Sequence, residues 1–249
     1  MPKFFVKTNQ IQGKNIIIQD EDVNHIKNVL RAKVEDQIHI CDYQTSKNYM
    51  CKIEKIEDMC INCQIIEEIH SSVEPHIHVS IFQGLPKADK MEFVIQKAVE
   101  LGVYDITPIE MKRCVVKLNE KDKKKKIQRW QKISEVAAKQ SGRDRIPVIN
   151  EIINTNTLCE KFKDYDLVFV AYENEKEHSL KQELKKIQKR NNKEMKIAVI
   201  IGPEGGIDKE EIEKFEKHTA KIITLGNRIL RTETVALNVL SIIMYELDS

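Results

Sequence analysis

Hydrophobic and polar positions alternate over short segments in the first seventy residues. These segments are rich in apolar and β-branched residues and are separated by turn-forming residues, a pattern that predicts strands. They are NIIIQ (15–19), DQIHICD (36–42), NYMCKIEKI (48–56) and INCQIIEEI (61–69). One segment, 20–33, instead has apolar residues at the spacing of a helix face. They are Val23, Ile26, Val29 and Leu30. The pattern predicts a small β-barrel with one helix.

The pattern changes after a polar, proline-containing linker, HSSVEP (70–75). Beyond it, apolar strands alternate with amphipathic helices. Strands are predicted at 76–84, 104–109, 166–173, 196–202 and 220–226, and helices at 88–102, 125–142, 179–190, 208–218 and 232–247. This alternation indicates a mostly parallel sheet with helices on both faces. We therefore divide the chain into a β-barrel domain, 1–72, and an α/β domain, 73–249.

Ligands of parallel sheets bind beyond the carboxyl ends of the strands. In this chain those ends lead into the loops 171–174, 202–207 and 225–231. The loop 202–207, GPEGGI, lacks the lysine and hydroxyl residues of a phosphate-binding loop. Pro203 removes a backbone donor, and Glu204 adds a negative charge. These features favour a ligand that is neutral or positively charged, although an ordinary tight turn before a helix also fits the sequence.

The segment LGNRILRTETVALNVL (225–240) joins the last strand to the last helix. Gly226 allows a turn or a close backbone approach to a ligand. Ile229 and Leu230 are bulky apolar residues in an exposed loop. They either line a pocket for a flat aromatic group or pack onto the core.

Charge is unevenly distributed along the chain. Residues 111–145 contain thirteen Lys or Arg and four Asp or Glu, a net charge of +9. Because the whole chain has a formal charge of +2, the remaining residues sum to −7. Such asymmetry indicates a basic surface for a polyanion. The run EKDKKKK (120–126) also fits a solvent-exposed start of a helix.

No segment approaches the length of about 18 apolar residues that a membrane span needs, and the N-terminal residues lack a long apolar signal segment. We expect a soluble, cytoplasmic protein without a membrane partner. The six cysteines are dilute and lie mostly in strand-like segments, as reduced buried thiols do. Cys60 and Cys63 form a C-x-x-C motif, but in a strand they would point to opposite faces. We therefore expect no metal site, with zinc as the alternative.

The two C-terminal glycine motifs closely resemble those of the RsmE group of ribosomal RNA uridine-N3 methyltransferases, in the SPOUT superfamily. The resemblance runs nearly end to end. It includes MPKFFV (1–6), HIKNVLRAK (25–33), KADKMEFVIQKAVELGV (87–103), RW (129–130) and AAKQSGRDRIPVI (137–149). It implies a PUA-like β-barrel, an α/β domain with a deep trefoil knot, a homodimer, and S-adenosylmethionine as cofactor. The implied reaction is methylation of N3 of one uridine in 16S ribosomal RNA of the small subunit.

The resemblance also assigns site residues. The cofactor would be held by Ala171, Tyr172, Gly202, Gly205, Gly206, Leu225, Gly226, Ile229 and Leu230. Arg231 would stabilise negative charge developing on the uracil. Glu233 would either help to remove the proton or hold Arg231, and we favour the holding role.

RNA contacts are expected from Arg143 and Arg145, in the segment QSGRDR, and from Lys3 and Arg31 in the barrel domain. Arg31 fits equally well as a cation at a helix end. Two other functions remain open. One is a SPOUT enzyme that methylates a ribose 2′-oxygen or another base; the other is a non-catalytic RNA-binding protein, against which the intact LRTET motif argues.

Overall fold

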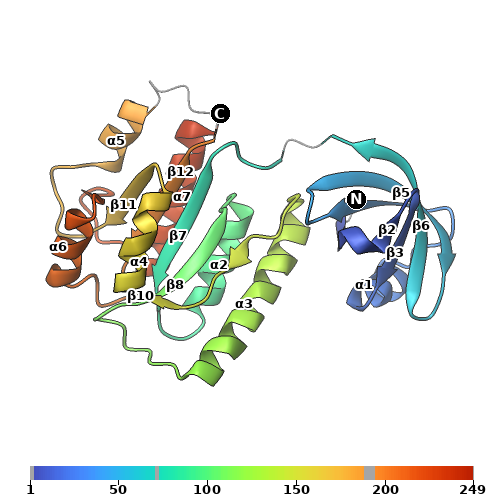
Figure 1. Ribbon diagram of the computed structural model, residues 1–249, viewed down its shortest axis with the longest axis horizontal. Helices are drawn as coiled ribbons and strands as arrows, with labels where there is room; N and C mark the ends of the chain where they lie inside the picture. Colours follow the sequence, from blue (N-terminus) through green and yellow to red (C-terminus); the bar gives the residue numbers. More distant parts are fainter. Residues whose placement is uncertain (1–2, 71–72, 188–193, 249) are drawn as a thin grey trace. The chain divides into compact units, whose positions relative to one another are not determined.

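The computed structural model describes residues 3–70, 73–187 and 194–248 (Figure 1). It divides the chain into two compact units. Unit 1 comprises residues 1–74 and 138–146, and unit 2 comprises residues 75–137 and 147–249. The division predicted from the sequence, at residue 72, places residues 138–146 in the second domain, whereas the structure places them in unit 1. In the predicted linker, residues 71 and 72 lie outside the described part of the chain.

Unit 1 is built on a curled six-stranded sheet with the order β1-β4-β5-β6-β3-β2. The strands are β1 (Lys3–Val6), β2 (Ile11–Gln12), β3 (Asn15–Gln19), β4 (Gln37–Asp42), β5 (Lys47–Ile56) and β6 (Cys60–Ile69). β1 pairs with β4 in parallel, and the other pairs are antiparallel. Ile16, Ile40 and Ile53 are completely buried in its core. The predicted β-rich domain is confirmed.

The helix predicted at 20–33 is shorter and changes type. α1 (Glu21–Asn24) continues into a π-helical turn, His25–Val29, in which the N–H of Leu30 donates to the carbonyl of His25. A π-turn holds more residues per turn than an α-helix, so it breaks the 3.6-residue period. Val23 and Ile26 are buried as predicted, but Val29 is 66% exposed. Leu30 is 38% exposed, so the prediction of a continuous apolar stripe is wrong at both Val29 and Leu30.

Unit 2 contains a parallel sheet with the order β10-β8-β7-β12-β11-β13, and β9 also pairs with β8. The strands are β7 (His78–Gly84), β8 (Asp105–Glu110), β9 (Val148–Ile149), β10 (Ile153–Asn154), β11 (Leu167–Ala171), β12 (Lys196–Ile201) and β13 (Lys221–Ile223). β7, β11 and β12 are almost continuously apolar and buried, because helices cover both faces of the sheet. The predicted α/β domain with a parallel sheet is confirmed.

The main helices of unit 2 are α2 (Lys90–Glu100), α3 (Glu120–Ser141), α4 (Thr155–Lys161), α5 (Leu180–Ile187), α6 (Lys209–Lys217) and α7 (Thr232–Leu247). α4 lies in front of the sheet in Figure 1, and α2 and α7 pack together behind it. α3 begins five residues before its predicted start, so the lysine run forms its first turns. α4 was not predicted; Asn154 caps it by accepting from the backbone of Asn156 and Thr157. Residues 188–190 of the predicted helix 179–190 lie outside the described residues.

All six cysteines are free thiols. Cys63 is buried in the core of unit 1, where burial raises the pKa of its thiol to about 12. Cys60 is half-buried, and its Sγ lies 3.0 Å from Oε2 of Glu57. The two cysteines of the C-x-x-C motif thus have different surroundings, as expected for opposite faces of a strand. Among the described helices, none is long and apolar enough to cross a membrane.

Buried ion pairs join the segment 138–146 to the rest of unit 1. Nζ of Lys3 lies 2.5 Å from Oδ1 of Asp144 and 2.8 Å from the carbonyl oxygen of Gly142. Arg143 is 4% exposed and its Nη2 lies 2.5 Å from Oε2 of Glu74. The resemblance assigns Lys3 and Arg143 to RNA contacts, but both cations are buried and neutralised inside unit 1. Their role in this structure is to fix the segment 138–146.

Arg143→Ala should destabilise unit 1. Without the guanidinium, the carboxylate of Glu74 keeps, among the described residues, the backbone amides of Asp144 and Arg145 as partners. We expect a loss of about 3 kcal/mol in the free energy of unfolding, the lower end for a broken buried pair, because Glu74 is partly exposed. Urea unfolding followed by circular dichroism measures this loss. Arg31→Ala, at an exposed position of the same unit, should change stability by less than about 0.5 kcal/mol. Equal stability of Arg143→Ala and the wild type would contradict the assignment.

Candidate active site

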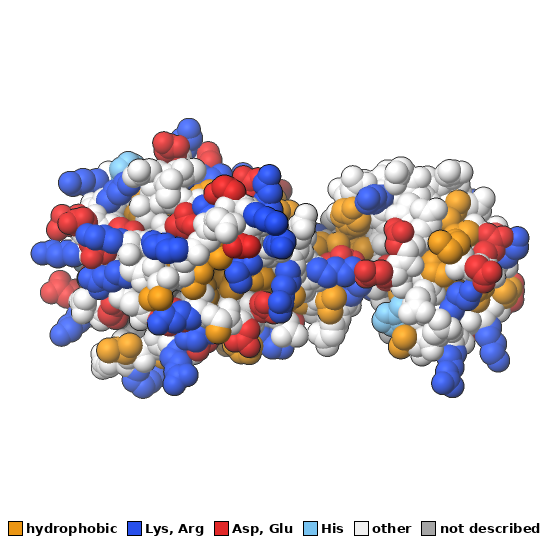
Figure 2. Space-filling view, turned by 90° about the horizontal axis from the view of Figure 1, so that it is seen from below, with side chains coloured by type: hydrophobic (Ala, Val, Ile, Leu, Met, Phe, Trp, Pro, Cys, Tyr) orange, Lys and Arg blue, Asp and Glu red, His pale blue; other side chains and the backbone are white. Residues whose placement is uncertain are grey.

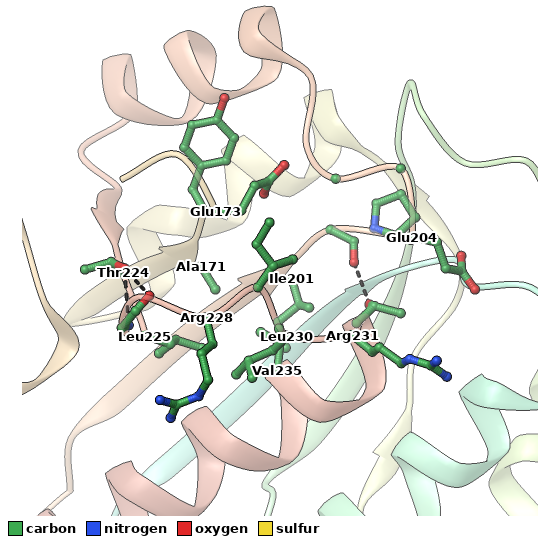
Figure 3. Close-up of a pocket in the computed structure, with 18 of the residues that line it drawn as sticks. Ala171, Glu173, Ile201, Glu204, Thr224, Leu225, Arg228, Leu230, Arg231 and Val235 are labelled. Carbon is green, nitrogen blue, oxygen red and sulfur yellow. Dashed lines mark hydrogen bonds between the residues drawn. The ribbon is translucent and has the colours of Figure 1, made fainter. Parts of the chain in front are cut away.

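Three loops of unit 2 surround one cavity at the carboxyl edge of the sheet (Figure 3). They follow β12, β11 and β13, which are neighbours in the sheet, so their carboxyl ends meet. The cavity has a volume of about 550 Å³, within the usual range for small-molecule sites. All nine residues that the family resemblance assigns to the cofactor line it, and so does Arg231.

A short chain of hydrogen bonds fixes the glycine turn. Oγ1 of Thr232 donates to the carbonyl oxygen of Gly202 at 2.6 Å, and Nε2 of Gln83 donates to Oγ1 of Thr232 at 2.9 Å. Gln83 is completely buried on β7, and Thr232 begins α7. The turn after β12 is thereby tied to the start of the last helix. Neither residue can be recognised from the sequence, because a buried glutamine and a threonine at a helix start carry no distinctive pattern.

Glycine is required in the turn by close packing. A Cβ built on Gly202 would lie 2.7 Å from Cγ1 of Ile207. Gly206 has φ +71°, in the left-handed region that favours glycine. These two glycines therefore keep the turn compact and leave its backbone bare toward the cavity.

One part of the cavity wall is apolar. Side chains of Ile201, Leu225, Leu230 and Val235 contribute to it. Ile229 is 86% exposed, so it lies at the rim of the cavity and does not pack onto the core. Apolar walls beside bare glycine backbone fit a flat aromatic ring whose polar edge takes hydrogen bonds from the main chain.

Lys90, on α2, neutralises two carboxylates beside the cavity. Its Nζ lies 3.0 Å from Oε1 of Glu204 and 3.4 Å from Oε2 of Glu233. Burial opposes ionisation of Glu204, but hydrogen bonds from backbone amides, including that of Lys87, and the ammonium of Lys90 lower its pKa below the ordinary value. Glu204 thus does not present a free negative charge, contrary to the expectation from the sequence. Lys90 itself was missed, since a lysine in the first turn of a helix is unremarkable in a sequence.

Glu233 makes its ion pair with Lys90, and the side chain of Arg231 has no ion-pair partner among the described residues. The interpretation that Glu233 holds Arg231 is therefore wrong. Arg231 is the N-cap residue of α7, with extended backbone angles. Figure 3 shows its side chain and that of Arg228 leaving the same loop in different directions. Both are exposed, line the cavity and lack hydrogen-bond partners for their side chains in the described part of the chain.

The two remaining residues assigned to RNA are accessible. Arg31 is exposed and follows the π-turn of unit 1, with φ +52°. Arg145 is half-exposed, and its backbone N–H donates to Glu74. On the face of unit 2 in Figure 2, Lys and Arg side chains are interspersed with Asp and Glu. The excess positive charge of residues 111–145 is thus partly offset locally, as where Lys123 pairs with Glu110 and Glu120.

Comparison with known proteins gives the class of this fold and site. Residues 73–244 match the family model of an RNA methyltransferase domain, and residues 18–58 match that of an RNA methyltransferase PUA domain. The ribosomal RNA small subunit methyltransferase E of Bacillus subtilis is 35% identical over all of this chain and 98% of its own length. That of Mesomycoplasma hyopneumoniae is 36% identical over 97% of this chain and 98% of its own.

A solved structure of the same type aligns over the whole length. The enzyme from Neisseria gonorrhoeae, bound to S-adenosyl methionine, has a TM-score of 0.85 at 28% identity and covers 98% of this chain and 97% of its own. The fold and site are thus those of an RNA methyltransferase with an attached PUA domain. The chain belongs to the ribosomal RNA small subunit methyltransferase E family, which confirms the resemblance found in the sequence.

Thr232→Val should loosen the glycine turn. Valine has nearly the same shape but no hydroxyl, so the carbonyl of Gly202 loses a donor and Gln83 loses an acceptor. We expect a loss of about 1 kcal/mol in unfolding free energy, the cost of a lost hydrogen bond, because Nε2 of Gln83 still donates to the carbonyl of Gly84 at 3.0 Å. Urea unfolding measures this loss.

Thr224→Val is the matched control. Among the residues that the structure describes, its hydroxyl makes long contacts with Gly226 alone, at 3.3 and 3.4 Å, near the surface. This variant should lose less than half as much stability. Equal losses in the two variants would show that the Gln83–Thr232–Gly202 chain has no special role.

Proposed function

We propose that this protein methylates N3 of a uridine in 16S ribosomal RNA of the small subunit, with S-adenosylmethionine as the methyl donor. The observation that carries the proposal is the cavity itself, which joins the GPEGGI and LRTET motifs around apolar walls. The family membership and the donor-bound relative support the same reaction.

The residues of the cavity fit this donor. Its adenine is flat and aromatic, and the apolar side chains with the bare backbone of the glycine turn suit such a ring. The donor has no phosphate, and the loop has no phosphate-loop lysine or hydroxyl to bind one. When bound, the donor supplies an electrophilic methyl group.

The protein's part is alignment and charge stabilisation. N3 of uridine carries a proton and becomes a good nucleophile only as that proton passes to solvent, so negative charge develops on the uracil until N3 takes the methyl group. Arg231, exposed at the cavity and without a protein partner in the described chain, stabilises this charge. Holding N3 in line with the methyl carbon contributes further, up to roughly 7–11 kcal/mol in the best cases. We assign Glu233, through its pair with Lys90, to positioning the start of α7.

RNA would approach through exposed cations of both units. Arg31 and Arg145 of unit 1 remain as phosphate contacts, joined by exposed lysines in the first turns of α3, such as Lys124 and Lys125. The target base must be unstacked before it can enter the site. A ribosomal RNA substrate supports a cytoplasmic location for the enzyme.

The resemblance further implies a knotted α/β domain that works as a homodimer. Large exposed side chains near the start and end of α7 favour a second copy as their cover: Ile229 is 86% exposed and Tyr245 is 80% exposed. Sedimentation equilibrium at micromolar concentration should give twice the chain mass of 29.0 kDa. A single species at the monomer mass would contradict the dimer.

The decisive test of the reaction uses unmethylated small subunits and donor labelled in its methyl group. After incubation, the RNA is digested to nucleosides, and label should appear in 3-methyluridine. Arg231→Ala should reduce the rate about 100-fold or more, the size of effect seen when a charge-stabilising donor is removed, while still binding the donor in calorimetry.

Other outcomes separate the rival functions. Label in a 2′-O-methylated nucleoside or another methylated base would identify a different RNA methyltransferase. Absence of label together with absence of donor binding would identify a non-catalytic RNA-binding protein. An unchanged rate in Arg231→Ala would remove that residue from the mechanism.

A further inference from the structure

Carboxylates beside the cavity are not equally compensated. Glu204 and Glu233 both lie against Lys90, at 3.0 and 3.4 Å. Glu173 also lines the cavity, but its side chain has no hydrogen bond or ion pair with any described residue. Glu173, an exposed residue, is therefore the carboxylate of this part of the cavity whose charge no described residue compensates.

Glu173 is placed by the glycine turn. It follows β11, and its carboxylate packs directly on Gly206, because a Cβ built on Gly206 would overlap Oε1 of Glu173. The glycine thus allows a carboxylate from one loop to lie on the backbone of another. In Figure 3, the side chain of Glu173 lies above Ile201, and the side chain of Arg228 lies below it. Glu173 and Arg228, which both lack side-chain partners in the described chain, therefore line the cavity from different sides.

An ionised carboxylate only accepts hydrogen bonds and attracts positive charge. The donor named in the proposed function carries two positive centres on its methionine arm, the sulfonium and the α-ammonium. We propose that Glu173 binds a positive centre of this arm, so that the cavity selects its ligand by charge as well as by shape. This inference rests on the proposed function, which it extends to a residue that neither glycine motif contains.

Calorimetry with three related ligands tests the role of Glu173. S-adenosylmethionine carries both positive centres, S-adenosylhomocysteine keeps only the ammonium, and 5′-methylthioadenosine has neither but retains the adenosine. Each is titrated into the wild type, Glu173→Gln and Glu177→Gln. Glu177 is exposed in the same loop and outside the cavity lining, so its variant has the same change in net charge. Thermal unfolding checks that both variants are folded.

Glu173→Gln should weaken binding of S-adenosylmethionine about tenfold, or about 1.4 kcal/mol, and leave 5′-methylthioadenosine unchanged. Glu177→Gln should bind all three ligands as the wild type does. If S-adenosylhomocysteine weakens equally, the partner of Glu173 is the ammonium; if it does not weaken, the partner is the sulfonium.

Two results would overturn the inference and leave the proposed function standing. One is wild-type affinity of Glu173→Gln for S-adenosylmethionine. The other is an equal loss for 5′-methylthioadenosine, which would place the ribose hydroxyls against the carboxylate. A folded wild type that binds none of the three ligands would overturn the proposed function and this inference together.

Discussion

The site depends on the hydrogen bonds that run from Gln83 through Thr232 to the carbonyl of Gly202. Gln83 comes from β7 and Thr232 from the start of α7, so residues 149 positions apart fix the backbone of the turn after β12. Because Gln83 is completely buried, these bonds are shielded from water. A rigid turn can present bare backbone groups to a ligand, which a flexible glycine-rich loop could not do without a large cost in conformational entropy.

Charge is arranged around this rigid turn. Lys90 connects Glu204 of the turn to Glu233 of α7 and compensates both carboxylates. The side chains of Arg231, Arg228 and Glu173 line the cavity without protein partners in the described chain. A bound ligand removes water from these charged groups, which costs free energy. This cost is offset only if the ligand supplies opposite charges. This requirement fits a zwitterionic donor together with a base that becomes anionic during the reaction.

The sequence predicts much of this arrangement, for physical reasons. Long apolar runs such as KIAVII indicate a buried parallel strand. The loops after parallel strands meet at one edge of the sheet, whatever their separation in the chain. The three loops 171–174, 202–207 and 225–231 can therefore be grouped around one cavity from the sequence, whereas the nine cofactor residues within them come from the family resemblance. The preference for a neutral or positively charged ligand was argued from Glu204, but Glu204 pairs with Lys90, and Glu173 is the cavity carboxylate without a partner among the described residues.

The sequence fails where a role depends on side-chain partners that are distant in the chain. Lys3 and Arg143 are cations of the kind that contact phosphates. Inside unit 1, however, Lys3 pairs with Asp144. Arg143 pairs with Glu74. Lys90 and Gln83 have no sequence signature, because their importance comes from what the fold places beside them. The π-turn at His25–Val29 likewise cannot be predicted from a 3.6-residue hydrophobic period, because it does not follow that period.

The central claim is that the cavity between the three loops holds the methyl donor. A crystal structure of the protein grown with S-adenosylmethionine tests it most directly. The account predicts the adenine ring against Leu225 and Leu230, with the methionine arm extending beneath Glu173. Donor bound elsewhere on the chain, or a cavity filled by the protein's own side chains in the presence of saturating donor, would contradict the account.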